Sequence, residues 1–162
     1  MKVLINAAPL IVLAKASLLR ILKEVFGEIY TTEVVMSEIL YPLKLGRESK
    51  DIKLIKSCTW IRVIRLREDE LRSHRRLIDQ LGIDPGEASL AAVYARGFDV
   101  VLMGDLRAER KLSAMGIRVI DIADLLILAD KKGLVKLREA AKKVWKSGYR
   151  TSSIRMLMHS TL

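Results

Sequence analysis

Short apolar runs along the chain alternate with longer segments in which apolar residues recur at a helical period. The runs at residues 61–64 and 99–102 have the length of strands, whereas residues 10–26 repeat apolar side chains every three or four positions up to Gly27. Strands separated by helices form parallel sheets covered on both faces, so the pattern predicts a three-layer α/β/α fold with a central, mainly parallel sheet. The predicted strands are residues 2–6, 28–30, 61–64, 99–102 and 117–120, and the predicted helices are about residues 10–26, 31–40, 47–57, 68–81, 84–95, 105–115, 121–131 and 134–145.

The composition predicts one globular domain over residues 1–162. With 51% hydrophobic and 30% charged residues, the chain has enough apolar side chains for a core and is too apolar to be disordered. Its single cysteine, Cys58, excludes an internal disulfide and a cysteine-based zinc site, and fits a reducing cytoplasm. The apolar run at residues 3–14 is interrupted by Asn6 and Pro9 and is shorter than the ~20 residues of a membrane span. We therefore expect a cytoplasmic protein, and the scarcity of Asn and Gln suggests a thermophilic source.

The positive charge is concentrated at the end of the chain. Residues 131–162 carry nine Lys or Arg and one acid, a charge of +8, which leaves +2 of the net +10 for residues 1–130. We interpret this basic helical C-terminal segment as a surface for the RNA backbone, although a solvated helix face is the simpler alternative and a membrane-surface helix a weaker one. Trp145 and Tyr149 flank basic residues there and could stack on bases. The candidate RNA-binding residues in the segment are Lys142, Lys143, Lys146 and Arg150.

Four polar residues lie at the edges of predicted apolar elements. Asn6 and Asp105 follow predicted strands, while Glu38 and Glu87 lie on predicted helices. Because the carboxyl ends of parallel strands share one edge of the sheet, these side chains are candidates to converge on one site. Oxygen ligands of this kind suit Mg²⁺ or Mn²⁺, which support phosphodiester chemistry.

Each of these residues also has a simpler explanation. Asp84 and Glu87 have the spacing of a capping box, and Asp105 has the position of a helix N-cap. Asn6 could be a turn residue, and Glu38 an exposed helix residue. The metal hypothesis therefore depends on the four residues together.

Four motifs in the same order resemble those of the PIN domain family, and specifically a toxin-like branch that begins Asn/Asp-x-Ser-Pro-Leu-Ile. The resemblance extends from residue 3 to about residue 134. The matching motifs are residues 6–11 (Asn-Ala-Ala-Pro-Leu-Ile), 33–38 (Glu-Val-Val-Met-Ser-Glu), 84–88 (Asp-Pro-Gly-Glu-Ala) and 102–108 (Leu-Met-Gly-Asp-Leu-Arg-Ala).

The resemblance implies a ribonuclease that depends on Mg²⁺ or Mn²⁺. It carries metal binding to Asn6, Glu38, Glu87 and Asp105, and catalysis to the last three of these. Many relatives are the toxins of toxin–antitoxin pairs, so an acidic antitoxin-like partner and a homodimer are expected. Arg107 and Arg110, on the helix after Asp105, are within reach of a bound phosphate in this interpretation.

The chain departs from the pattern of the wider family at several positions. Asn6 replaces the usual Asp, Ala8 stands where Ser or Thr is frequent, and Gly104 replaces the first acid of an Asp-Asp pair. Glu109 stands where Arg is common. These changes favour two alternatives to the nuclease: an RNA-binding module with weakened catalysis, and a protein-interaction domain with a basic tail for an acidic partner.

Overall fold

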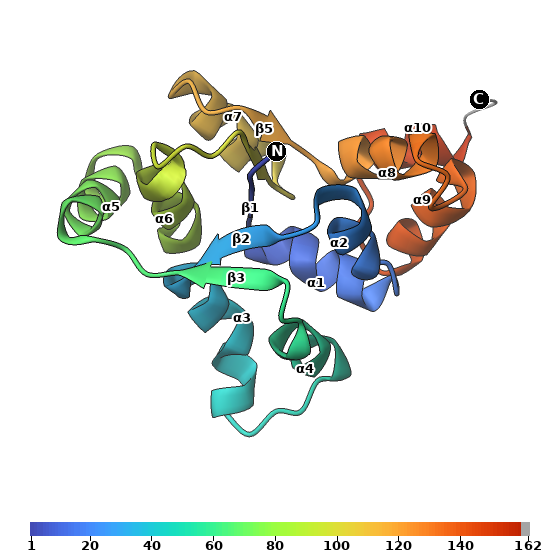
Figure 1. The fold of residues 1–162 in the computed structure, drawn as a ribbon, viewed down its shortest axis with the longest axis horizontal. Coiled ribbons are helices and arrows are strands. Elements are labelled where there is room, and N and C mark those ends of the chain that lie inside the picture. Colours follow the sequence, from blue (N-terminus) through green and yellow to red (C-terminus); the bar gives the residue numbers. More distant parts are fainter. Residues whose placement is uncertain (160–162) are drawn as a thin grey trace.

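The computed structural model describes residues 1–159, and within them five parallel strands form one sheet (Figure 1). The order β3-β2-β1-β4-β5 places β1 at the centre. In register, Leu4 of β1 pairs with Tyr30 on one side and Val101 on the other. The strands are β1 (Val3–Ile5), β2 (Ile29–Thr32), β3 (Ile61–Ile64), β4 (Val100–Leu102) and β5 (Val119–Ile120).

Helices pack on both sides of the sheet, as the three-layer prediction requires. In Figure 1, α3 and α4 lie below β2 and β3, α5–α7 lie above them, and α8–α10 form a group at the right-hand end of the molecule. Within residues 1–159 the helices are α1 (Ala7–Lys15), α2 (Arg20–Phe26), α3 (Glu33–Lys44), α4 (Lys50–Ser57), α5 (Glu68–Leu81), α6 (Pro85–Tyr94), α7 (Leu106–Ala114), α8 (Ile122–Lys131), α9 (Leu137–Lys146) and α10 (Ser152–Met158). In this part of the chain, no helix is both long and apolar enough to cross a membrane.

The two central strands are the most deeply buried part of the molecule. Every residue of β1 and β4 is at most 1% exposed. Strands covered on both faces must be apolar on both faces, which explains why they read as unbroken apolar runs instead of alternating ones. Each of these aliphatic side chains contributes about 2 kcal/mol by leaving water.

The later strands are added to the sheet on both sides of the central strand β1. From β1 the chain proceeds to β2 and β3 on one side, and it then crosses back to β4 and β5 on the other. Such a switch point opens a crevice at the carboxyl ends of the two strands that flank it. Here these strands are β1 and β4, and the backbone N–H of Asn6 donates to the carbonyl of Leu102 at 3.1 Å across them.

Several predicted boundaries were wrong. The predicted helix at 10–26 is two helices, because Ser17 lies in the left-handed region (φ 58°) and ends α1. Helix α3 continues through Pro42 to Lys44, and in this last turn Leu43 packs partly buried against the core. Helix α10, capped by the Thr151 hydroxyl and held by the buried Ile154, was not predicted. The basic C-terminal segment is described as far as residue 159, and its last three residues lie outside the described part.

Candidate active site

A chain of buried hydroxyl groups fixes the start of α6 against β2 and α3. The Ser89 hydroxyl donates to the carbonyl of Gly86 at 2.6 Å, and it lies 2.5 Å from the Thr32 hydroxyl. Because the Ser89 proton is already used, Thr32 donates to Ser89, and the Thr32 oxygen accepts from the N–H of Val35 at 3.2 Å. One relay thus caps α3 and anchors the turn that carries Glu87.

Glu87 is a buried carboxyl group at the start of α6, with 8% of its surface exposed. Its pKa is raised from 4.5 to about 7, mainly by burial and then by the nearby carboxylates of Asp84 and Asp105, against the opposing effect of Lys111. Only half of the expected capping box forms, because the Asp84 side chain accepts no hydrogen bond from α6, whereas the Glu87 carboxyl group accepts one from the backbone of Asp84. Glu87 therefore keeps part of the local role that its spacing indicated and also faces other acids.

Glu87 and Asp105 line one cavity of about 220 Å³. Asp84 shares this cavity, as do the basic residues Arg107 and Lys111. Asp105 caps α7 by accepting a hydrogen bond from the backbone of Arg107 at 3.0 Å, so its predicted N-cap position is confirmed. The carboxylates are thus adjacent to two cations that suit a phosphate group.

The other two predicted ligands, Glu38 and Asn6, do not line this cavity. Glu38 lies against the start of α6, since a Cβ added at Gly86 would stand 2.9 Å from its Oε2. Burial raises the pKa of Glu38, with a smaller contribution from Asp84. Asn6 ends β1 and is half-buried beside the end of β4, and its side chain makes no capping bond to α1. Whether all four hold a metal ion stays a prediction.

A second acidic group, which the sequence did not single out as a site, lies on the other side of Asp105. It comprises Glu109 on α7 and Asp121 and Asp124 at the start of α8. Burial raises the pKa of Glu109 to about 7, together with the charges of Asp121, Asp124 and Asp105. Burial and the neighbouring Asp124 likewise raise the pKa of Asp121. Asp121 follows a strand as Asp105 does, and that position was the available signal.

Tyr149 connects the C-terminal segment to this acidic region. Its hydroxyl donates to the carbonyl of Gly104 at 2.7 Å, immediately before Asp105. Burial raises the pKa of this phenol, and the charges of Asp121, Glu109 and Asp105 raise it further. The phenol therefore stays a neutral donor, and its hydroxyl is engaged in the fold, which differs from the base-stacking use considered from the sequence.

Two departures from the family pattern contact each other. A Cβ added at Gly104 would stand 3.0 Å from the Cβ of Ala8, a separation tighter than nearly all real Cβ contacts. Any side chain at 104 would crowd the first turn of α1, where a larger residue at 8 would also sit. The glycine at 104 therefore leaves room for the Ala8 side chain at this close approach.

The predicted RNA-binding residues fall into two sets. Arg107 lines the acidic cavity, whereas Arg110 lies on the exposed face of α7. The guanidinium of Arg150 lies 5.7 Å from the centre of the Trp145 ring. The side chains of Lys142, Lys143 and Lys146 are exposed on α9.

A parallel α/β/α fold with carboxylates at its switch point belongs to a class of proteins that bind charged ligands at that edge. A family model described as DUF3368, PIN domain, matches residues 2–156, and the chain belongs to the PIN domain family. No curated protein matches the chain. PIN domains are generally nucleases and typically use a divalent metal ion.

The donors at the crevice fit such an ion by their chemistry. They are oxygen ligands, and the raised pKa of Glu87 reflects burial first and then the negative charge of Asp84 and Asp105, which a cation would neutralise. Over residues 1–159, however, no three His, Cys, Asp or Glu side chains are gathered closely enough to form a metal-binding group.

Proposed function

We propose that the chain is a metal-dependent endoribonuclease that hydrolyses phosphodiester bonds of RNA. One observation carries the proposal. The buried Glu87 carboxyl group has its pKa raised to about 7 by burial and by Asp84 and Asp105, in a cavity that also contains Arg107 and Lys111. Buried acids with perturbed pKa values, next to phosphate-binding cations, are typical of a catalytic centre.

In this proposal, the acidic residues of the cavity bind the metal ion and the basic residues bind the phosphate. Glu87 and Asp105 would hold Mg²⁺ or Mn²⁺, with Glu38 and Asn6 as the further predicted ligands and Asp84 as an additional candidate. When bound, the ion activates a water molecule as nucleophile and neutralises developing charge. Arg107 and Lys111 would orient a phosphate of the substrate.

The basic residues outside the cavity would hold the RNA chain. Lys142, Lys143, Lys146 and Arg150 supply exposed positive charge on and after α9, and Arg110 supplies it on α7. Contacts of this kind are independent of sequence and weaken steeply with salt. They account for binding, and the acidic cavity accounts for cleavage.

The test is cleavage of a mixed pool of folded and single-stranded RNA by wild type and by Asp105→Asn, with Mn²⁺, with Mg²⁺ or with EDTA. Asparagine preserves the N-cap of α7 and removes only the charge, so the variant should fold normally. Asp79→Asn, on the exposed face of α5, is the matched control. Cleavage by wild type and the control that requires metal and is lost in Asp105→Asn would support the nuclease. No metal-dependent cleavage by wild type would reject it.

A second candidate is an RNA-binding module with weakened catalysis. It is favoured by the neutral Asn6, by the Ala8–Gly104 contact, and by the separation of the carboxylates in the described residues. This candidate predicts salt-dependent RNA binding that Asp105→Asn leaves intact and that no metal converts into cleavage. The same pool of RNA, assayed by filter binding, distinguishes the two.

We further propose a toxin role with an acidic antitoxin-like partner, and a homodimer. The basic charge of the chain, +10 overall, supports the acidic partner. Expression of wild type but not of Asp105→Asn should arrest growth if the toxin role is correct. Light scattering of the purified protein tests the dimer independently.

A further inference from the structure

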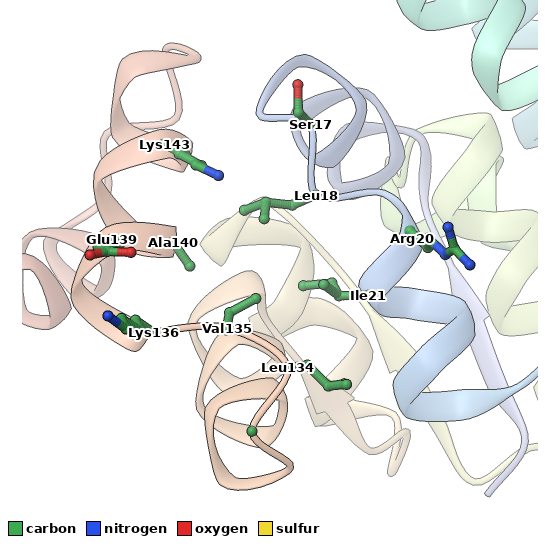
Figure 2. A pocket seen from close by; sticks show the side chains of 11 residues that line it. Ser17, Leu18, Arg20, Ile21, Leu134, Val135, Lys136, Glu139, Ala140 and Lys143 are labelled. Carbon is green, nitrogen blue, oxygen red and sulfur yellow. The ribbon is translucent and has the colours of Figure 1, made fainter.

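A hollow on the described part of the protein lies far from the acidic cavity. It has a volume of about 490 Å³ and lies between the turn that joins α1 to α2 and the segment that joins α8 to α9 (Figure 2). Helix α1 begins at the carboxyl end of β1, and nine helical residues carry the chain about 13 Å towards the opposite edge of the sheet. The hollow, which we call the distal groove, is therefore a separate site.

The floor of the distal groove is aliphatic. Figure 2 shows Leu18 and Ile21 on one side, facing Val135 and Ala140 on the other, with Leu134 beside them. Leu134 retains 37% of its surface exposed, although the neighbouring Leu18 and Ala140 are buried. A floor of this kind accepts aliphatic side chains.

The rim of the distal groove is basic. Arg20, Lys136 and Lys143 line it against one acid, Glu139, and Arg20 also forms an ion pair with Glu24 at 3.5 Å. In Figure 2, the Lys143 side chain extends from α9 across the opening towards Leu18. Both lysines are exposed, so the rim presents a net positive charge to solvent around an apolar floor.

A second hollow of about 420 Å³ continues the groove past the same turn. It shares Ser17 and Arg20 with the first and adds the cation of Lys23 and the apolar Leu54, which is 46% exposed. The shared Ser17 is held at φ 58°, a conformation that costs an L-residue about 1 kcal/mol and that keeps the turn between the two hollows. Two hollows in series suit an elongated ligand better than a compact one.

We propose that the distal groove docks an acidic amphipathic segment of a partner protein. Aliphatic side chains of the segment would occupy the floor, and its carboxylates would face Arg20, Lys23, Lys136 and Lys143, while Glu139 disfavours a basic ligand. The open, shallow shape fits a segment of a macromolecule, because a small-molecule site encloses most of its ligand. The inference concerns binding alone and does not depend on the nuclease.

The test measures the anisotropy of a fluorescent helical peptide of about four turns, with leucines on one face and glutamates on the other. The wild type should bind this peptide, and Lys143→Glu should bind it at least about tenfold more weakly, because a rim attraction becomes a repulsion. Leu134→Ser should weaken binding severalfold through the floor while leaving the charge unchanged. Lys44→Glu, on α3, makes the same change of charge away from the groove and should bind as wild type does.

Two comparison ligands separate this site from general attraction of acids. A peptide with serine in place of every leucine keeps the charge, and a single-stranded RNA of equal charge keeps the charge without an aliphatic face. The proposal fails if wild type does not bind the leucine peptide, if the serine peptide binds equally well, or if Lys44→Glu is as damaging as Lys143→Glu. It also fails if Lys143→Glu weakens RNA binding alone, which would identify the groove as a nucleic-acid surface.

Discussion

Replacing Glu87 with glutamine removes a buried carboxyl group whose ionisation the fold opposes. The side chain is 8% exposed and faces Asp84 and Asp105, and the amide is nearly isosteric with the acid. In the absence of metal, we therefore expect Glu87→Gln to be more stable than wild type above neutral pH. This is the reverse of the usual effect of a substitution at a buried polar position.

The magnitude follows from the pKa of Glu87, which rises from 4.5 in the unfolded chain to about 7 in the folded one. At 1.36 kcal/mol for each pKa unit, the upper limit is about 3 kcal/mol, and solvent in the open cavity reduces it to roughly 2 kcal/mol. Because the folded pKa is the higher one, the wild type is favoured below pH 4.5 and loses this stability as pH rises through 7. The gap between variant and wild type should therefore be small at pH 4.5 and complete by about pH 8.

Urea unfolding of both proteins in EDTA, at several pH values between 4.5 and 8, measures this gap. Glu68→Gln, at the exposed start of α5, is the control and should show no comparable pH-dependent gain. Added Mn²⁺ should then stabilise wild type more than Glu87→Gln, because the cation binds the ionised carboxylate. A variant that is less stable than wild type at pH 8 in EDTA, or a gap that does not grow with pH, would refute the reasoning.

Two further predictions concern groups that support the site. Arg96→Ala leaves the Glu70 carboxylate, which is 7% exposed, without its ion-pair partner. It should therefore lower the free energy of unfolding, measured in urea, by about 3–5 kcal/mol, and a loss below about 1 kcal/mol would contradict this. Tyr149→Phe removes a hydroxyl that donates to the carbonyl of Gly104 at 2.7 Å, just after β4. Tyr94→Phe removes one that donates to the carbonyl of Asp99 at 3.1 Å, just before β4. Each variant should lower the free energy of unfolding by about 1 kcal/mol. Only Tyr149→Phe should weaken Mn²⁺ binding in calorimetry, since its partner precedes Asp105, and equal effects of the two variants would show that the hydroxyl is merely structural.

The sheet was predictable because its central strands are short and apolar on every side chain. Residues 3–5 and 100–102 have this pattern in the sequence, and burial on both faces requires it. The break at Ser17 was not predictable, since a serine in the left-handed region carries no local signal comparable to a glycine. Local hydrophobic patterns were thus enough to predict the layers and the strands. They could not predict that residues 10–26 form two helices, because this depends on the backbone conformation of one residue, Ser17.

The candidate site was predictable where strands end and helices begin. Glu87 and Asp105 could be placed together because the carboxyl ends of parallel strands share one edge. The contribution of Asp121 depends on β5 lying next to β4, which is a matter of strand order. The contact of Tyr149 with Gly104 joins residues 45 positions apart and depends on how the C-terminal segment packs.

The strand order also changes how the neutral Asn6 should be judged. From the sequence alone, an Asn in place of an Asp at position 6 counts as one negative charge fewer for binding a metal ion. However, Glu87 and Glu109 each have a pKa of about 7, so near neutral pH each is only partly ionised. A further carboxylate beside the end of β4 would add repulsion to a crevice that already holds more acid than it can ionise. A bound cation would lower both pKa values and release protons, recovering charge that the metal-free fold suppresses. The capacity of this crevice for a metal ion therefore depends on how far its buried acids can be ionised, and the identity of residue 6 sets only part of it.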